Sequence, residues 1–93
     1  MRGKMSFSKF ELVKSTAGRD LGNVYLIKEI LDKDYVLLID GKAKTISNPK
    51  KKKIKHITSL GVVEESLHKT FNDNSKTNDG VIRKIVKNFE EKC

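Results

Sequence analysis

The sequence is poor in cysteine and has no long hydrophobic run. Cys93 is its one cysteine, which excludes an internal disulfide and a cysteine-built zinc site and fits a reducing, cytoplasmic setting. No stretch approaches the roughly 20 apolar residues that a membrane-spanning helix needs. The basic start at residues 1–5 is not followed by a hydrophobic segment, so a secretory signal is not expected. Together these absences predict a cytoplasmic protein that makes no membrane contact.

Positive charge, by contrast, is in excess and unevenly distributed. The chain has 20 Lys and Arg against 12 Asp and Glu, a net charge of +8. Residues 1–56 carry 14 of these cations against 6 acids, whereas residues 57–93 carry 6 of each. Such asymmetry is typical of one-sided contact with a polyanion. The alternative is a basic domain whose charge only keeps it soluble.

The densest positive segment is 48–56, which reads Asn-Pro-Lys-Lys-Lys-Lys-Ile-Lys-His. It favours a nucleic acid as partner, because each lysine that meets a phosphate releases a condensed counterion. Pro49 stiffens the start of the run, while Ile54 and Ile57 anchor its far end, so these lysines lose less freedom on binding than lysines on a tail. A solvated loop and a nuclear localisation signal are the alternatives.

Aromatic side chains are scarce, with four phenylalanines, two tyrosines and no tryptophan. A protein that stacks many unpaired bases is expected to expose more rings than this. Most of these residues occupy positions typical of a core. If the partner is RNA, the shortage favours phosphate contacts and structured RNA over single-strand stacking.

The first 60 residues predict five short strands, at 10–15, 22–31, 35–39, 42–46 and 54–58. The second has apolar residues on both faces, which favours a strand covered on both sides or one at a sharply coiled position of a barrel. Asp40-Gly41 predicts a two-residue type I′ turn, because both central positions of that turn need positive φ. Short strands joined by tight turns imply a mostly β fold, a small antiparallel barrel.

The character of the sequence becomes helical after Leu60. Apolar residues recur every fourth position at Val63, Leu67 and Phe71, which favours a short helix. A second helix is predicted to begin near Thr77 or Asn78, both good N-cap types. The apolar residues of this helix are spaced to form one stripe, which consists of Val81, Ile82, Ile85, Val86 and Phe89.

The predicted organisation is therefore a flexible N-terminus at 1–9, a barrel at 10–60 and a helical extension at 61–93. The extension either caps the open end of the barrel or presents its apolar stripe to a protein partner.

The glycine-punctuated loop 18–22 lacks the Lys-Ser/Thr ending of a nucleotide-binding P-loop. Its glycines favour a tight turn that brings backbone N–H groups near a phosphate or a base edge. Arg19 adds a planar guanidinium that grips a phosphate with two bonds or stacks on a base. An ordinary strand connection with a solvated arginine is the alternative.

No residue pattern predicts catalysis, a metal or a cofactor. His56 lies among lysines, which oppose cation binding, and His68 has no partner at a metal-ligand spacing. The segment from Asp73 lacks the glycine at position six and the final glutamate of a calcium loop. No Ser/His/Asp or Cys/His set stands out, so we expect a protein that is not an enzyme.

Three segments resemble one family when they are taken in order. Residues 13–22, with the apolar strand 24–31, resemble the KOW motif of ribosomal and transcription-associated proteins. Asp40-Gly41-Lys42 followed by 48–56 resembles the bacterial KOW-domain RNA-binding proteins, which are similar in turn to the fourteen-e class of large-subunit ribosomal proteins. Thr77-Asn78 leading into Ile82-Arg83-Lys84 is similar to the C-terminal helix of that bacterial group. The chain departs from the group at Leu21, where a basic residue is more usual, and in its polar loop 72–76.

The resemblance implies an SH3-like barrel that binds ribosomal or other structured RNA. The glycine loop and the lysine run are expected on the same side, with Arg19 and backbone groups orienting the RNA. The predicted contact residues are Lys14, Arg19, Lys42, Lys44, Lys50, Lys51, Lys52, Lys53, Lys55 and His56. The alternative is an SH3-like protein-interaction module that binds an acidic or peptide partner.

Overall fold

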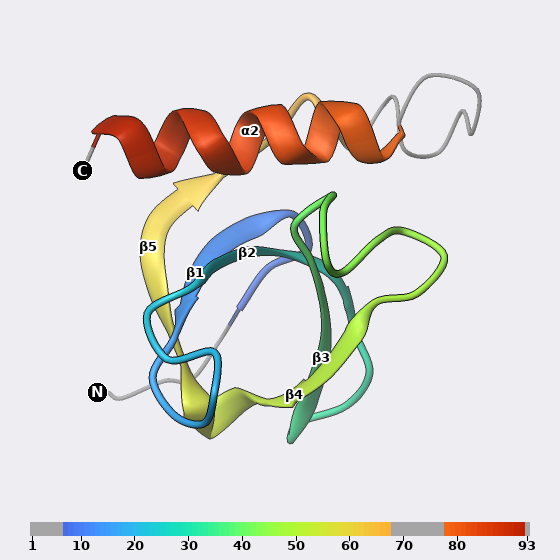
Figure 1. Cartoon of the computed structure of the whole chain (residues 1–93). Coiled ribbons are helices and arrows are strands. Elements are labelled where there is room, and N and C mark those ends of the chain that lie inside the picture. Colours follow the sequence, from blue (N-terminus) through green and yellow to red (C-terminus); the bar gives the residue numbers. More distant parts are fainter. Residues whose placement is uncertain (1–6, 68–77, 93) are drawn as a thin grey trace.

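The computed structural model shows a strongly curled antiparallel sheet of five strands with a helix along one side (Figure 1). It describes residues 7–67 and 78–92. The elements are β1 (Glu11–Ser15), β2 (Val24–Ile30), β3 (Tyr35–Ile39), β4 (Lys50–Lys53), the 3-10 turn η1 (Ile54–His56), β5 (Ile57–Val63) and α2 (Asp79–Lys92). The prediction of a mostly β fold with a C-terminal helix is confirmed.

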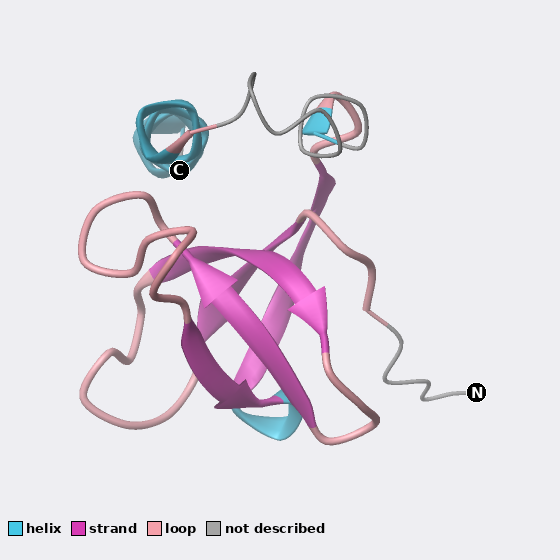
Figure 2. Ribbon diagram, turned by 90° about the vertical axis from the view of Figure 1, so that its right-hand side faces the viewer, coloured by secondary structure: helices cyan, strands magenta, loops and turns pink. Residues whose placement is uncertain are grey.

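The sheet is curled but not closed. Its strand order is β4-β3-β2-β1-β5, so β4 and β5 form the two edges. The backbone passes from one edge to the other through η1 (Figure 2). The predicted barrel therefore takes the form of an open, coiled sheet.

The central strands are buried on both faces because their side chains alternate between two cores. The inner face of the curl holds Val13, Tyr25, Ile27, Val36, Leu38, Ile54 and Ile57. The outer core lies between the sheet and α2 and holds Phe10, Leu12, Val24, Leu26, Ile39, Leu67, Ile82 and Val86. The prediction that the second strand is covered on both sides is confirmed over residues 24–27, whereas Ile30 and Leu31 at its predicted end are exposed.

Helix α2 packs against the outer face of the sheet. Its Ile82 and Val86 are buried there, and the predicted stripe is otherwise half-buried except for Val81, which is 37% exposed. The helix begins where its sequence predicts, because the Asn78 side-chain oxygen accepts the N–H of Val81 at 3.1 Å. The stripe therefore holds the helix to the sheet.

The fourth strand differs from the prediction. Residues 42–46 form no strand, and their one ladder contact is a single bridge between Thr45 and Asn48. Only Gly41 of the expected type I′ pair has positive φ, at 77°. The Asp40 carboxylate instead accepts the N–H groups of Lys42 and Lys44, each at 2.9 Å, and closes a wider loop over 40–49. The strand that pairs with β3 is the lysine run itself.

The helical extension begins later than predicted. Strand β5 continues to Val63, past the expected boundary at residue 60. Leu67 is helical and buried in the outer core, whereas Phe71 lies outside the described residues.

Within 7–67 and 78–92, no helix is long and apolar enough to cross a membrane.

The loop 40–49 is fastened to the start of α2. The Asp79 carboxylate accepts the N–H of Ile46 at 2.7 Å. A Cβ built on Gly41 would overlap the carbonyl oxygen of Asp79 and lie 2.5 Å from the nitrogen of Arg83. The backbone of Gly41 therefore contacts the backbone of α2 directly.

Candidate nucleic-acid interface

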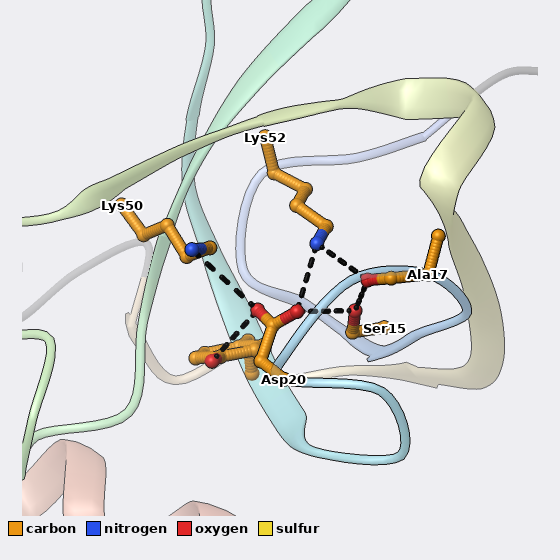
Figure 3. Close-up of polar contacts among 6 residues, drawn as sticks. Ser15, Ala17, Asp20, Lys50 and Lys52 are labelled. Carbon is orange, nitrogen blue, oxygen red and sulfur yellow. Dashed lines mark hydrogen bonds and ion pairs between the residues drawn. The ribbon is translucent and has the colours of Figure 1, made fainter.

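A polar cluster joins the β1–β2 loop to β4 at the inner face of the curl (Figure 3). The Asp20 carboxylate accepts hydrogen bonds from the Ser15 hydroxyl at 2.9 Å and the Tyr25 hydroxyl at 3.0 Å. The Lys52 ammonium donates to the same carboxylate at 2.8 Å and to the Ala17 carbonyl at 2.9 Å. We call this group, together with Lys50, the Asp20 cluster.

The Asp20 cluster is largely screened from solvent, since the side chains of Asp20 and Lys52 are only 11% and 10% exposed. Burial alone would raise the pKa of the Asp20 carboxyl. Hydrogen bonds from Lys52, Ser15 and Tyr25, with the charge of Lys52, outweigh burial and lower that pKa from 3.8 to about 2. Burial, with the neighbouring Asp20 charge, raises the pKa of Tyr25. The Asp20 carboxylate is thus held in its ionised form at neutral pH.

This lowered pKa predicts a pH-dependent stability. A carboxylate whose pKa is lower in the folded than in the unfolded chain stabilises the fold above pH 4, and that stabilisation is lost as pH falls towards 2. The free-energy difference between the wild type and Asp20→Asn is therefore expected to shrink by about 2 kcal/mol over that window. Urea unfolding at a series of pH values measures it. A difference that stays constant from pH 5 to 2 would contradict the assignment.

The four lysines of β4 do not form one surface, because strand geometry sends alternate side chains to opposite faces. Lys50 and Lys52 pair in register with Leu38 and Val36 of the inner core. Lys50 lies 3.8 Å from the Asp20 carboxylate. Lys51 and Lys53 are exposed on the outer face. The ammonium of Lys52 is committed to the Asp20 cluster, so the geometry does not favour its predicted contact with RNA, which stays a prediction.

A hollow of about 360 Å³ lies beside the outer lysines and is called the basic hollow. It is lined by Lys33, Asp34, Tyr35, Lys53, Ile54 and Lys55. Lys51 lies next to it, with its ammonium 4.6 Å from the centre of the Tyr35 ring. The basic hollow therefore brings Lys53 and Lys55 of the lysine run together with Lys33 of the turn before β3.

A second hollow of about 500 Å³ lies between α2 and the loop 40–49 and is called the helix groove. Its lining residues are Asn23, Val24, Asp40, Lys42, Ala43, Arg83, Val86, Lys87 and Glu90. It shares no residue with the basic hollow. Figures 1 and 2 both place η1, which contributes Ile54 and Lys55 to the basic hollow, on the side of the sheet away from α2. The structure therefore places Lys42, one of the predicted contact residues, in a different hollow from Lys53 and Lys55.

The predicted contact residues Lys14, Arg19, Lys44 and His56 line neither hollow. Arg19 is exposed in the loop that carries Asp20, so the glycine loop and the lysine run do lie together, as expected. Lys14 is exposed on β1, opposite Thr58 of β5. Lys44 and His56 are half-buried, and the backbone carbonyls of both accept hydrogen bonds.

Four residues that complete the two hollows were not predicted from the sequence: Lys33, Tyr35, Arg83 and Lys87. Lys33 and Tyr35 become neighbours of the lysine run only once that run is recognised as the partner of β3. Arg83 and Lys87 carried a usable signal, because residues four apart lie on the same side of a helix.

No described carboxylate lies within 4.0 Å of the cations of either hollow. The ion pairs within 4.0 Å in the described part of the chain are those of Asp20 with Lys50 and with Lys52. Lys33, Lys53 and Lys55 around the basic hollow therefore have no carboxylate at that distance from a described residue. The same holds for the three cations of the helix groove. These charges are available to a ligand.

No protein-family model matches the chain, and no curated protein matches it significantly. The likeness to KOW-domain proteins thus rests only on the three sequence segments that resemble that family. No three His, Cys, Asp or Glu side chains gather at a metal-binding distance in the two described stretches.

Proposed function

We propose that this domain binds structured RNA through the outer lysines of β4 and the basic hollow, and that it acts by binding rather than by catalysis. The observation that carries the proposal is the grouping of Lys51, Lys53 and Lys55 with Lys33 around one concave surface. These side chains are exposed and are held by a strand and its adjoining turns.

Electrostatics favours phosphate as the ligand of this surface. Three lysines and one acid, Asp34, line the basic hollow. The nearby Asp32 carboxylate already accepts the N–H groups of Asp34 and Tyr35, at 2.8 and 2.9 Å. Each lysine that meets a phosphate releases a counterion. Because these lysines are held by β4, η1 and the turn between β2 and β3, little backbone freedom is lost on binding.

The distribution of aromatic residues supports RNA over the alternative, an SH3-like module for a peptide. Such a module is expected to expose a groove lined by several aromatic side chains. The basic hollow has one, Tyr35, and the helix groove has none. A third hollow, of about 370 Å³ between β5 and α2, has Phe89 alone. Phosphate contact with a shaped RNA needs no such lining.

The triple variant K51A/K53A/K55A tests the proposal, because it removes charge from the proposed surface and leaves the Asp20 cluster intact. We expect the slope of log K against log salt for an RNA hairpin to lose about 2–3 units and affinity to fall roughly 100-fold at 0.15 M salt. Fluorescence anisotropy across a salt series measures both quantities.

The matched control is K9A/K28A/K84A, which removes the same charge at positions that lie outside both hollows and are not predicted contact residues. Its slope is expected to stay near that of the wild type. An equal loss in the control would mean that net charge rather than this surface sets affinity. A wild-type affinity that does not change with salt would overturn the phosphate mechanism itself.

A further inference from the structure

The helix groove has the composition of a second anion site. Lys42 comes from the loop 40–49, whereas Arg83 and Lys87 come from successive turns of α2. None of these three cations has a carboxylate of a described residue within 4.0 Å. Arg83 adds a planar fork of donors that fits a phosphate with two bonds. Lys42 thus converges on one concavity with Arg83 and Lys87, which follow it by 41 and 45 positions in the chain.

The helix groove is built rigidly. The backbone contact at Gly41 and the bond from Ile46 to Asp79 hold the loop against α2. Ile82 and Val86 hold α2 against the sheet. The three cations therefore start from elements whose relative positions are set before any ligand arrives, which lowers the entropic cost of binding.

The two acids of the helix groove refine the choice of ligand. One Asp40 oxygen is occupied by two N–H groups of its own loop. Glu90 lies two helical turns beyond Arg83 and lines the same groove. Carboxylates beside cations accept hydrogen bonds from 2′-hydroxyl groups while the cations contact phosphates. This mixture suits a ribose-phosphate backbone, because the 2′-hydroxyl is the group that distinguishes RNA from DNA.

We infer that the helix groove is a second RNA-backbone site and that the domain bridges two RNA segments. The inference rests on the proposed function, which supplies the first site at the basic hollow. The two sites have no lining residue in common, and the basic hollow is formed in part by η1, away from α2 (Figure 1). Separate RNA segments are therefore expected to occupy them.

A sandwich experiment tests the bridge. An RNA hairpin is immobilised and saturated with the protein, unbound protein is washed away, and a fluorescent copy of the hairpin is added. The wild type is expected to capture the second hairpin. The variant R83A/K87A is expected to bind the immobilised hairpin but to capture about tenfold less of the second. Native mass spectrometry is expected to show one protein with two hairpins.

Lys84 supplies the control, because it is exposed on the same helix but does not line the groove. K84A is expected to capture the second hairpin as the wild type does. Circular dichroism is used to check that all variants are folded. Wild-type binding without capture, equal capture by R83A/K87A, or capture by a protein dimer would each overturn the bridge and leave the proposed function standing. No binding to the immobilised hairpin would overturn both.

Discussion

Gly41→Ala is expected to lower the free energy of unfolding by about 3 kcal/mol or more. An added Cβ would overlap the carbonyl oxygen of Asp79 and lie 2.5 Å from the nitrogen of Arg83. Both are backbone atoms, so no side-chain rotation relieves the overlap. Either α2 moves away from the sheet or the loop 40–49 does, and the burial of Ile82 and Val86 is weakened in both cases.

The control for this prediction is Gly22→Ala. Gly22 also has positive φ, at 89°, but a Cβ built there meets nothing within 4 Å. Its substitution is expected to cost only the backbone strain, about 1–2 kcal/mol. Thermal and urea unfolding, followed by circular dichroism, measure both variants. Equal losses at the two glycines would show that the contact between the loop and α2 does not stabilise the fold.

Gly41→Ala also bears on the helix groove. Because the same contact positions Lys42 relative to Arg83, a displaced helix is expected to weaken capture of a second RNA in the sandwich experiment. Binding through the basic hollow is expected to persist while the sheet remains folded, because neither β4 nor η1 contributes to the helix groove.

Lys52→Met is expected to destabilise the protein by about 2–3 kcal/mol. The methionine keeps most of the packing of the lysine stem but removes the ammonium that bonds Asp20 and the Ala17 carbonyl. The Asp20 carboxylate then stays buried with only the more distant Lys50 as counter-charge. Its retained bonds from Ser15 and Tyr25 keep the expected loss below that of a fully orphaned charge.

The same substitution one position earlier is the matched control. Lys51 is exposed, and its contact with the Tyr35 ring is worth about 0.5–1 kcal/mol. Lys51→Met should therefore barely change stability yet weaken RNA binding. Lys52→Met should lower stability but leave RNA binding nearly unchanged at a temperature where the variant is folded. Urea denaturation and anisotropy on the same samples separate the two effects. Equal stabilities of the two variants would show that the Asp20 cluster does not stabilise the fold.

Much of the fold could be predicted from local patterns. The apolar positions of 22–31 indicated a strand buried on both faces, and the third strand was predicted at its observed bounds. Asn78 was a predicted start of α2. These features depend on the period of two in a strand, the period of 3.6 in a helix and the chemistry of an N-cap, all of which are written in adjacent residues.

The first strand shows where such reasoning loses precision. It was predicted from Phe10, but the structure begins it at Glu11, because Phe10 adopts a positive φ of 66° while buried in the outer core. Non-glycine residues rarely adopt that conformation, so nothing local in the sequence indicates it. The surrounding core accommodates it.

The lysine run shows the larger limit. Lysine has a low strand propensity, so the run reads as a loop, and 42–46, with its isoleucine and threonine, reads as the better strand. Pairing with β3 overrides that preference, because Lys50 and Lys52 find a carboxylate and the stems of the run lie along a sheet edge, where lysine is well tolerated. The candidate site changes accordingly, from a uniform patch to alternate residues.

The amino-acid sequence by itself determined the excess of cations, their concentration before residue 57, the apolar residues of the two cores and the periodicity of most elements. The tertiary structure decided which cations are available to a ligand. Lys50 and Lys52 meet Asp20 across 29 and 31 intervening residues, and Lys42 lines the same groove as Arg83, 40 intervening residues away. Such meetings depend on strand register and helix docking, which the packing of the whole chain selects and no short segment encodes.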